Sequence, residues 1–157
     1  VRASSIGLGW TGLCESSQLR SLEDKNIGRE HYSKKSLETR PQSGIAEIDS
    51  FVELVATKSV VRAKILNSYF VEMERVLVQC KRVLAIDGFM VLVAGPNQVS
   101  GLPCDTPSML LKLAKRSGLH PTMELVDGIR SRGLMTRRNK TASTIVCEHI
   151  YLLKHAD

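Results

Sequence analysis

Aromatic side chains are scarce in this sequence, at 4% of its residues, and cysteine is present only as four widely separated residues. Cys14, Cys80, Cys104 and Cys147 form no C-x-x-C pair and have no paired histidines beside them, so the spacing does not indicate a zinc site. No apolar run approaches the roughly 20 residues of a membrane helix, and the N-terminus has no signal pattern. We therefore expect reduced thiols, a cytoplasmic location and no membrane partner.

The overall composition is typical of one globular domain. The chain has 157 residues, of which 43% are hydrophobic and 24% are charged, a balance that favours a folded core over disorder. Its formal charge is +6 and its pI is about 9.3. Because Lys and Arg displace counterions from phosphates, an excess of them favours a polyanionic partner, although a soluble basic protein has the same overall charge.

Hydrophobic periodicity divides the chain near residue 58. Residues 1–58 are weakly patterned, and we predict a linker region of loops with one or two short helices, one of them near residues 45–57. Residues 59–157 are predicted to form a partial domain that begins with a long amphipathic helix to about Leu84. The apolar positions of that helix recur every three or four residues, at Leu66, Phe70, Met73, Leu77, Cys80 and Leu84.

The pattern after this helix predicts an α/β fold. Phe89–Ala94 is a continuous apolar run, typical of a central parallel strand that is buried on both faces. Thr106 as cap and Pro107 at the first helical position predict a helix that stops at Gly118. Two further strands are expected near residues 122–129 and 143–153. This order is that of the second half of a doubly wound sheet, in which a final hairpin closes one edge.

One glycine-rich segment near the N-terminus has the residue spacing of a dinucleotide-binding motif. Gly7–Gly12 fits G-x-G-x-x-G, in which glycines let the backbone approach a phosphate at a helix N-terminus. Only six residues precede it, too few for the strand that the motif requires, and Trp10 is bulky for such a turn. We therefore predict a surface loop.

A basic segment is the strongest indication of a nucleic-acid partner. No acidic residue occurs from residue 130 to residue 140, and long cationic chains of this kind can contact phosphates. An Asn side chain can also hydrogen-bond a base edge. The alternative is a solvated loop that only keeps the protein soluble. We predict that the DNA-contacting residues are Arg130, Arg132, Arg137, Arg138, Asn139 and Lys140.

Several segments together resemble one enzyme family. Tyr69–Leu77 and Arg82–Asn97 look like the helix and fifth strand of bacterial and archaeal amino-group DNA methyltransferases. Ser131–Leu134 and Arg138–Ala142, followed by Glu148–Ile150, are similar to the closing hairpin of one such family. The resemblance implies the C-terminal half of a Rossmann-like sheet that ends in this hairpin. It also places Gly95, Pro96 and Asn97 at the edge of a base pocket, although the family usually has Gly-Asn-Asn there.

The resemblance also implies a reaction and a missing part. The complete enzyme would transfer a methyl group from S-adenosylmethionine to an amino nitrogen of adenine or cytosine in DNA, after flipping the base. The family's cofactor loop and Asp/Ser-Pro-Pro-Tyr catalytic loop do not occur in this sequence. We therefore expect neither cofactor binding nor catalytic residues in this chain alone. Three interpretations remain open: a split enzyme, a truncated enzyme, or a non-catalytic binding or assembly subunit. We expect the chain to form a homo-oligomer or to pair with a separate N-terminal half.

Overall fold

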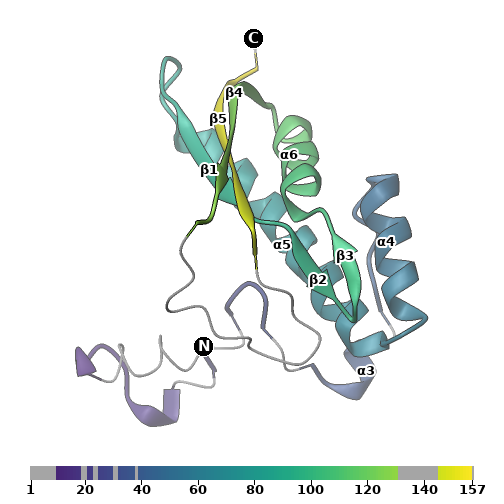
Figure 1. Cartoon of the computed structure of the whole chain (residues 1–157). Coiled ribbons are helices and arrows are strands. Elements are labelled where there is room, and N and C mark those ends of the chain that lie inside the picture. The colour runs from purple at the N-terminus through teal and green to yellow at the C-terminus, as the bar shows by residue number, and fades with distance from the viewer. Residues whose placement is uncertain are drawn as a thin grey trace.

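Three longer helices and a three-stranded antiparallel sheet form most of the described part of the chain, a mixed α/β arrangement (Figure 1). The computed structural model describes residues 10–18, 21–22, 25–29, 32–37, 39–130 and 145–156. The short elements are η1 (Ser16–Gln18), α3 (Lys34–Leu37), β2 (Asn97–Val99) and β3 (Leu102–Cys104). The longer ones are α4 (Ala46–Ala56), α5 (Val60–Val83), β1 (Met90–Ala94), α6 (Thr106–Arg116), β4 (Leu119–Gly128) and β5 (Cys147–His155).

The predicted long helix and the short helix before it are both present, as α5 and α4. The Ser59 hydroxyl caps α5 by accepting a hydrogen bond from the Arg62 N–H at 3.3 Å, which satisfies one of the free donors of the first turn. Both helices bury one face in a common core, so α4 packs with the domain although it lies in the segment predicted as a linker. The core side chains on the two helices include Ile48, Val52, Val55, Ala63, Leu66, Phe70 and Leu77. Within the described residues, no helix is long and apolar enough to cross a bilayer.

Helix α6 begins one residue earlier than the cap assignment predicted. Asp105, not Thr106, is the N-cap, and its carboxylate accepts a hydrogen bond from the Ser108 N–H at 3.2 Å. Asp is as good a cap as Thr, and Pro107 is tolerated in the first turn, where its missing N–H costs no helical hydrogen bond. The helix ends before Gly118, whose φ of +82° is the left-handed conformation that stops many helices.

The sheet has the order β1-β5-β4, and β5 is antiparallel to both neighbours. Strands β1 and β4 are therefore parallel to each other, and the final strand inserts between them. The prediction that Phe89–Ala94 is a central strand buried on both faces is wrong for the described structure. β1 pairs only with β5, and the side chains of Val91 and Val93 are 59% and 51% exposed. The apolar run is half-exposed because helices cover only one face of the sheet.

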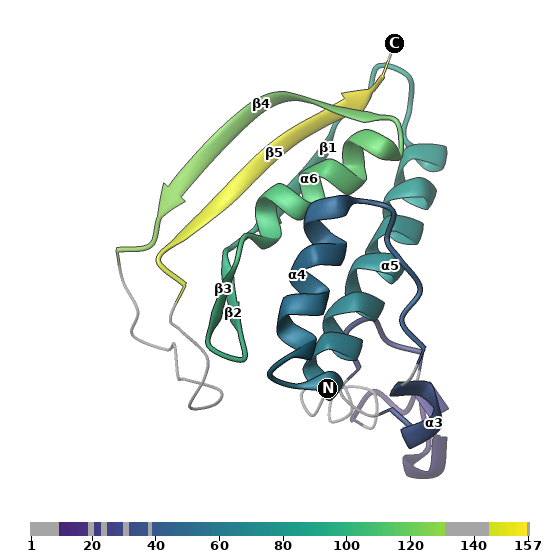
Figure 2. The same ribbon diagram turned by 90° about the vertical axis from the view of Figure 1, so that its right-hand side faces the viewer.

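The other face of the sheet is apolar and is covered by no helix that the structure describes (Figure 2). Residues opposite each other in an antiparallel pair share a face, and the register puts Val91 beside Leu152 and Met123, and Val93 beside Ile150 and Leu125. Lys154 lies over the Phe89 ring, 5.0 Å from its centroid. We call this surface the open face; it consists of Phe89, Val91, Val93, Met123, Leu125, Ile150 and Leu152.

A two-stranded hairpin that the sequence analysis missed connects β1 to α6. β2 and β3 pair through the register Asn97 to Cys104 and Val99 to Leu102. The two residues of its turn, Ser100 and Gly101, have φ values of +52° and +79°. Positive φ at both positions is the geometry of a type I′ turn, which suits the twist of a tight hairpin. The Ser-Gly pair was the available signal, but the strands on either side are only three residues long.

Candidate nucleic-acid interface

The predicted site residues that the structure describes lie at one end of the sheet. Ala94, at the carboxyl end of β1, pairs with His149, and Gly128, at the carboxyl end of β4, pairs with Cys147. The carboxyl ends of the two parallel strands therefore meet beside the start of β5, and the β2–β3 hairpin projects from the same end (Figure 1).

Gly95, Pro96 and Asn97 form the short connection from β1 to β2 at this end. The Asn97 side chain is exposed, and its amide oxygen accepts a hydrogen bond from the Gln98 N–H at 2.7 Å. That oxygen therefore supports the start of the hairpin. Gly95 lies against the strand opposite: a Cβ atom at this position would be 2.8 Å from Ile145 Cγ2 and 3.3 Å from the Cys147 carbonyl oxygen.

We expect Gly95→Ala to destabilise the protein by about 1–3 kcal/mol, because the added methyl group overpacks the contact with Ile145 and with backbone that cannot rotate away. Equilibrium denaturation in urea measures this change. Gly128→Ala is the matched control, since a Cβ atom there would have no neighbour within 4 Å. Equal stability of the two variants would contradict the close approach at Gly95.

The basic segment begins and ends on adjacent strands. The Ile129 N–H donates to the Val146 carbonyl at 3.0 Å, which extends the β4–β5 ladder by one step. Arg130 follows directly and is exposed. The other predicted DNA-contacting residues, namely Arg132, Arg137, Arg138, Asn139 and Lys140, lie outside the described residues. The structure thus brings Arg130 to the end of the sheet that carries Gly95–Asn97, and it does not describe where the remaining cations lie.

A polar cluster that the sequence analysis did not single out lies close to this end, on the helix side of the sheet. His149 Nδ1 is 3.2 Å from Glu124 Oε1, and the His149 and Tyr151 rings stack with centroids 6.1 Å apart. Burial, with the carboxylates of Glu124 and Asp105 nearby, raises the pKa of Tyr151 to about 12. Tyr151 is therefore a neutral phenol at neutral pH. The i, i+2 spacing of His149 and Tyr151 in β5 predicts that they share one face of the sheet. Their partner Glu124 lies in β4, so the sequence gives no sign of that contact.

The cluster has the groups for proton transfer but no second feature of a catalytic site. Among the described residues, no group of three His, Cys, Asp or Glu side chains could hold a metal ion. The Cys104 thiol, in the nearby β3, is buried, and burial raises its pKa, so it is a poor nucleophile at neutral pH. We therefore assign the cluster to packing between the sheet and α6.

The G-x-G-x-x-G segment is described only in its second half, from Trp10 to Gly12. Residues 7–9 lie outside the described residues, and the Trp10 side chain is 91% exposed. The first described strand is β1, which starts far later at Met90. A dinucleotide-type loop joins a strand to a helix N-terminus, and the residues that would precede this loop lie outside the described part of the chain.

Comparison of the chain with known proteins finds no matching family model, no matching curated protein and no matching solved structure.

Proposed function

We propose that this chain is the C-terminal half of an S-adenosylmethionine-dependent DNA methyltransferase and works with a separate N-terminal half. One observation supports the proposal: the described sheet has an apolar face and a strand edge that another chain could cover. All its pairings are antiparallel, its open face is covered by no helix that the structure describes, and the outer edge of β1 has no described partner. Exposed apolar side chains beside an unpaired strand edge form a surface that favours association with another chain.

The motifs indicate which function each of the two polypeptides of the proposed enzyme would have. The N-terminal half would carry the cofactor loop and the Pro-Pro-Tyr catalytic loop, since neither occurs in this sequence. This chain would contribute the sheet end with Gly95–Asn97 and the basic segment that starts at Arg130. Its cations would contact DNA phosphates. The methyl donor, once bound by the other half, would supply the group transferred to the base.

The second candidate is a nucleic-acid-binding or assembly subunit without catalysis. The same basic segment supports it, and so does the lack of catalytic motifs in the sequence. The two proposals differ in what the chain does after its open face is covered. In the first, the complex transfers methyl groups; in the second, the complex only binds.

Reconstitution tests the proposal. The DNA adjoining the codon for Val1 is read for a segment with a cofactor loop and a Pro-Pro-Tyr motif, and that segment is co-expressed with this chain. We expect the mixture, but neither polypeptide alone, to transfer labelled methyl groups from S-adenosylmethionine to adenine or cytosine in duplex DNA. The isolated chain should show no binding of S-adenosylmethionine by calorimetry.

Each other outcome has a defined meaning. A stable complex that binds DNA without methyl transfer would favour the assembly subunit. Saturable micromolar binding of S-adenosylmethionine by this chain alone would show that it contains a cofactor site and would overturn the proposed division. No adjoining segment and no complex would remove the methyltransferase proposal.

A further inference from the structure

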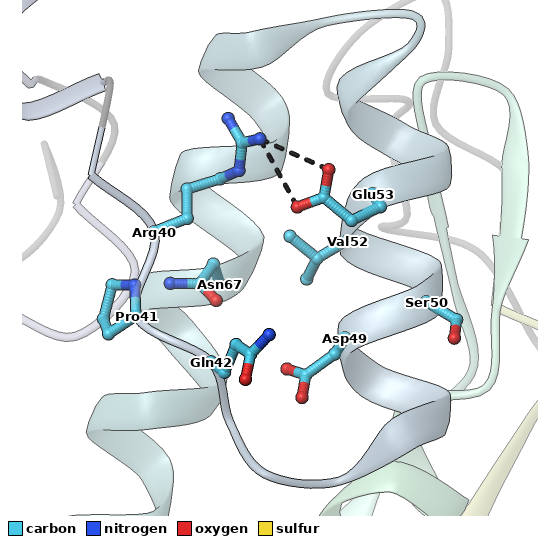
Figure 3. A pocket seen from close by; sticks show the side chains of 8 residues that line it. All are labelled: Arg40, Pro41, Gln42, Asp49, Ser50, Val52, Glu53 and Asn67. Atoms are coloured by element: carbon cyan, nitrogen blue, oxygen red, sulfur yellow. Dashed lines mark hydrogen bonds and ion pairs between the residues drawn. The ribbon is translucent and has the colours of Figure 1, made fainter.

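The helical layer contains a pocket of about 310 Å³, lined by residues of α4, of α5 and of the segment before α4 (Figure 3). Arg40 and Asn67 line it, but the Nε of Arg40 and the Nδ2 of Asn67 are buried atoms that a ligand in the pocket cannot reach. The Arg40 guanidinium is also paired with the Glu53 carboxylate, at 3.4 Å from each oxygen. We therefore assign no ligand to this pocket.

The open face of the sheet, in contrast, carries charges of opposite sign at its two ends. Side chains two residues apart in a strand lie on the same face, so Glu148 and Lys154 share the open face with Ile150 and Leu152 of β5. The contact of Lys154 with the Phe89 ring is on this face as well. Glu148 and Lys154 are separated by about 20 Å, at roughly 3.4 Å per residue.

Strand β4 has the same arrangement of charge. The register pairs His120 with Lys154 and Asp127 with Glu148, and paired residues share a face. One end of the open face therefore carries Lys154 and His120, and the other end carries Glu148 and Asp127. The apolar side chains lie between the two ends.

The acidic end has no counter-ion in the part of the chain that the structure describes. Asp127 and Glu148 are directly opposite each other, and like charges in that position destabilise a sheet. Within the described residues, no ion pair includes Asp127, Glu148 or Lys154. A cation from another molecule would relieve the repulsion between the two carboxylates.

A second copy of the chain carries a matching set of charges. Two sheets that pack face to face lie about 10 Å apart, with their strands nearly aligned. When the strands of the second copy run antiparallel to those of the first, a two-fold axis beside Tyr151, midway between Glu148 and Lys154, places each Lys154 over the partner's Glu148. The same axis brings His120 to the partner's Asp127. With the strands parallel, each Lys154 would instead face the partner's Lys154.

We infer that the open face is the interface of a homodimer in which two sheets pack face to face with antiparallel strands. The apolar side chains supply the affinity, and the two reciprocal contacts between Lys154 and Glu148 fix the orientation. The inference does not rest on the proposed methyltransferase role, because it uses only the described sheet. A separate N-terminal half that covers the open face would compete with the second copy.

Charge reversal at each end tests the orientation. Lys154→Glu and Glu148→Lys each turn both attractive contacts of the dimer into repulsive ones. We expect each variant to raise the dissociation constant at least about tenfold in sedimentation equilibrium at low salt. An equimolar mixture of the two variants should associate as the wild type does, because each reversed charge then faces a charge of opposite sign.

Lys58→Glu is the matched control, because Lys58 is exposed between α4 and α5, and this variant should dimerise as the wild type does. A cooperative thermal melt of each variant verifies that the fold is retained. Wild-type dissociation constants for both reversals would overturn the inference, since parallel strands or pairing through the β1 edge would leave them unchanged. A monomeric wild type, or no recovery in the mixture, would overturn it as well.

Discussion

At micromolar concentration the chain should sediment as a dimer or larger assembly rather than as a 17.4 kDa monomer. The reason is the open face together with the edge of β1, which has no strand partner among the described residues. An unpaired edge beside exposed apolar side chains is a template for association. In a cell, we expect the N-terminal half to cover the same surface; for the purified chain alone, a second copy is the available partner.

Val93→Lys tests which surface associates. Val93 lies on the edge strand β1 within the open face and is 51% exposed, so a lysine there would bury an unpaired charge in an interface formed by this edge and face. That penalty is several kcal/mol per ion, and we expect the dissociation constant to rise by about 100-fold or more. Val83→Lys is the control, because it adds the same charge at a position that is 75% exposed at the end of α5.

Sedimentation equilibrium of the wild type, Val93→Lys and Val83→Lys measures whether each protein associates. Association of wild type and Val83→Lys, with a monomeric Val93→Lys, is the expected pattern. A wild-type chain that is a clean monomer with a cooperative melt would sink the association hypothesis. It would favour the alternative that part of residues 1–58 covers the gap. The longest described helix of that region, α4, packs on α5 instead.

Replacement of Arg137, Arg138 and Lys140 by alanine should flatten the salt dependence of DNA binding. Each phosphate contact contributes a slope of about −0.9 to the plot of log K against log salt concentration, so the loss of three contacts should reduce the slope by about 2.7. The wild type should bind unrelated duplexes with similar affinity, because phosphate contacts carry no sequence information. Fluorescence anisotropy at several salt concentrations measures both.

A charge-matched control separates the basic segment from the overall charge. Lys58, Arg75 and Lys115 are exposed on the helical layer, and their replacement by alanine lowers the net charge by the same three units. This control should keep most of the wild-type slope. If both triple variants have the same slope, the affinity comes from the overall charge, and the basic segment is a solvated loop. An unchanged slope in the first variant would remove the segment from the interface.

The longer helices and the three strands of the main sheet were predictable because their signals are local. Ser59 and Gly118 cap their helices by short-range hydrogen bonds and backbone conformation, and the spacing of Leu66, Phe70 and Leu77 is set by the helix repeat itself. The N-cap at Asp105, one residue before the predicted cap, shows that such signals place a helix end to within about one residue. Asp and Thr are comparable N-cap residues, and Asp105 and Thr106 are adjacent in the chain. Which of the two caps the helix depends only on which side-chain oxygen accepts from a free N–H of the first turn.

The sequence by itself determined the order of the longer elements, the basic segment between the last two strands and the absence of the family's catalytic and cofactor motifs. Only the tertiary structure decided that β5 inserts between β1 and β4, that Glu124 meets His149, and that Asn67 and Arg40 line one pocket. It also decided that Val91 and Val93 are exposed. An apolar run shows that a strand can be buried on both faces, but whether it is buried depends on which other elements are there to cover it.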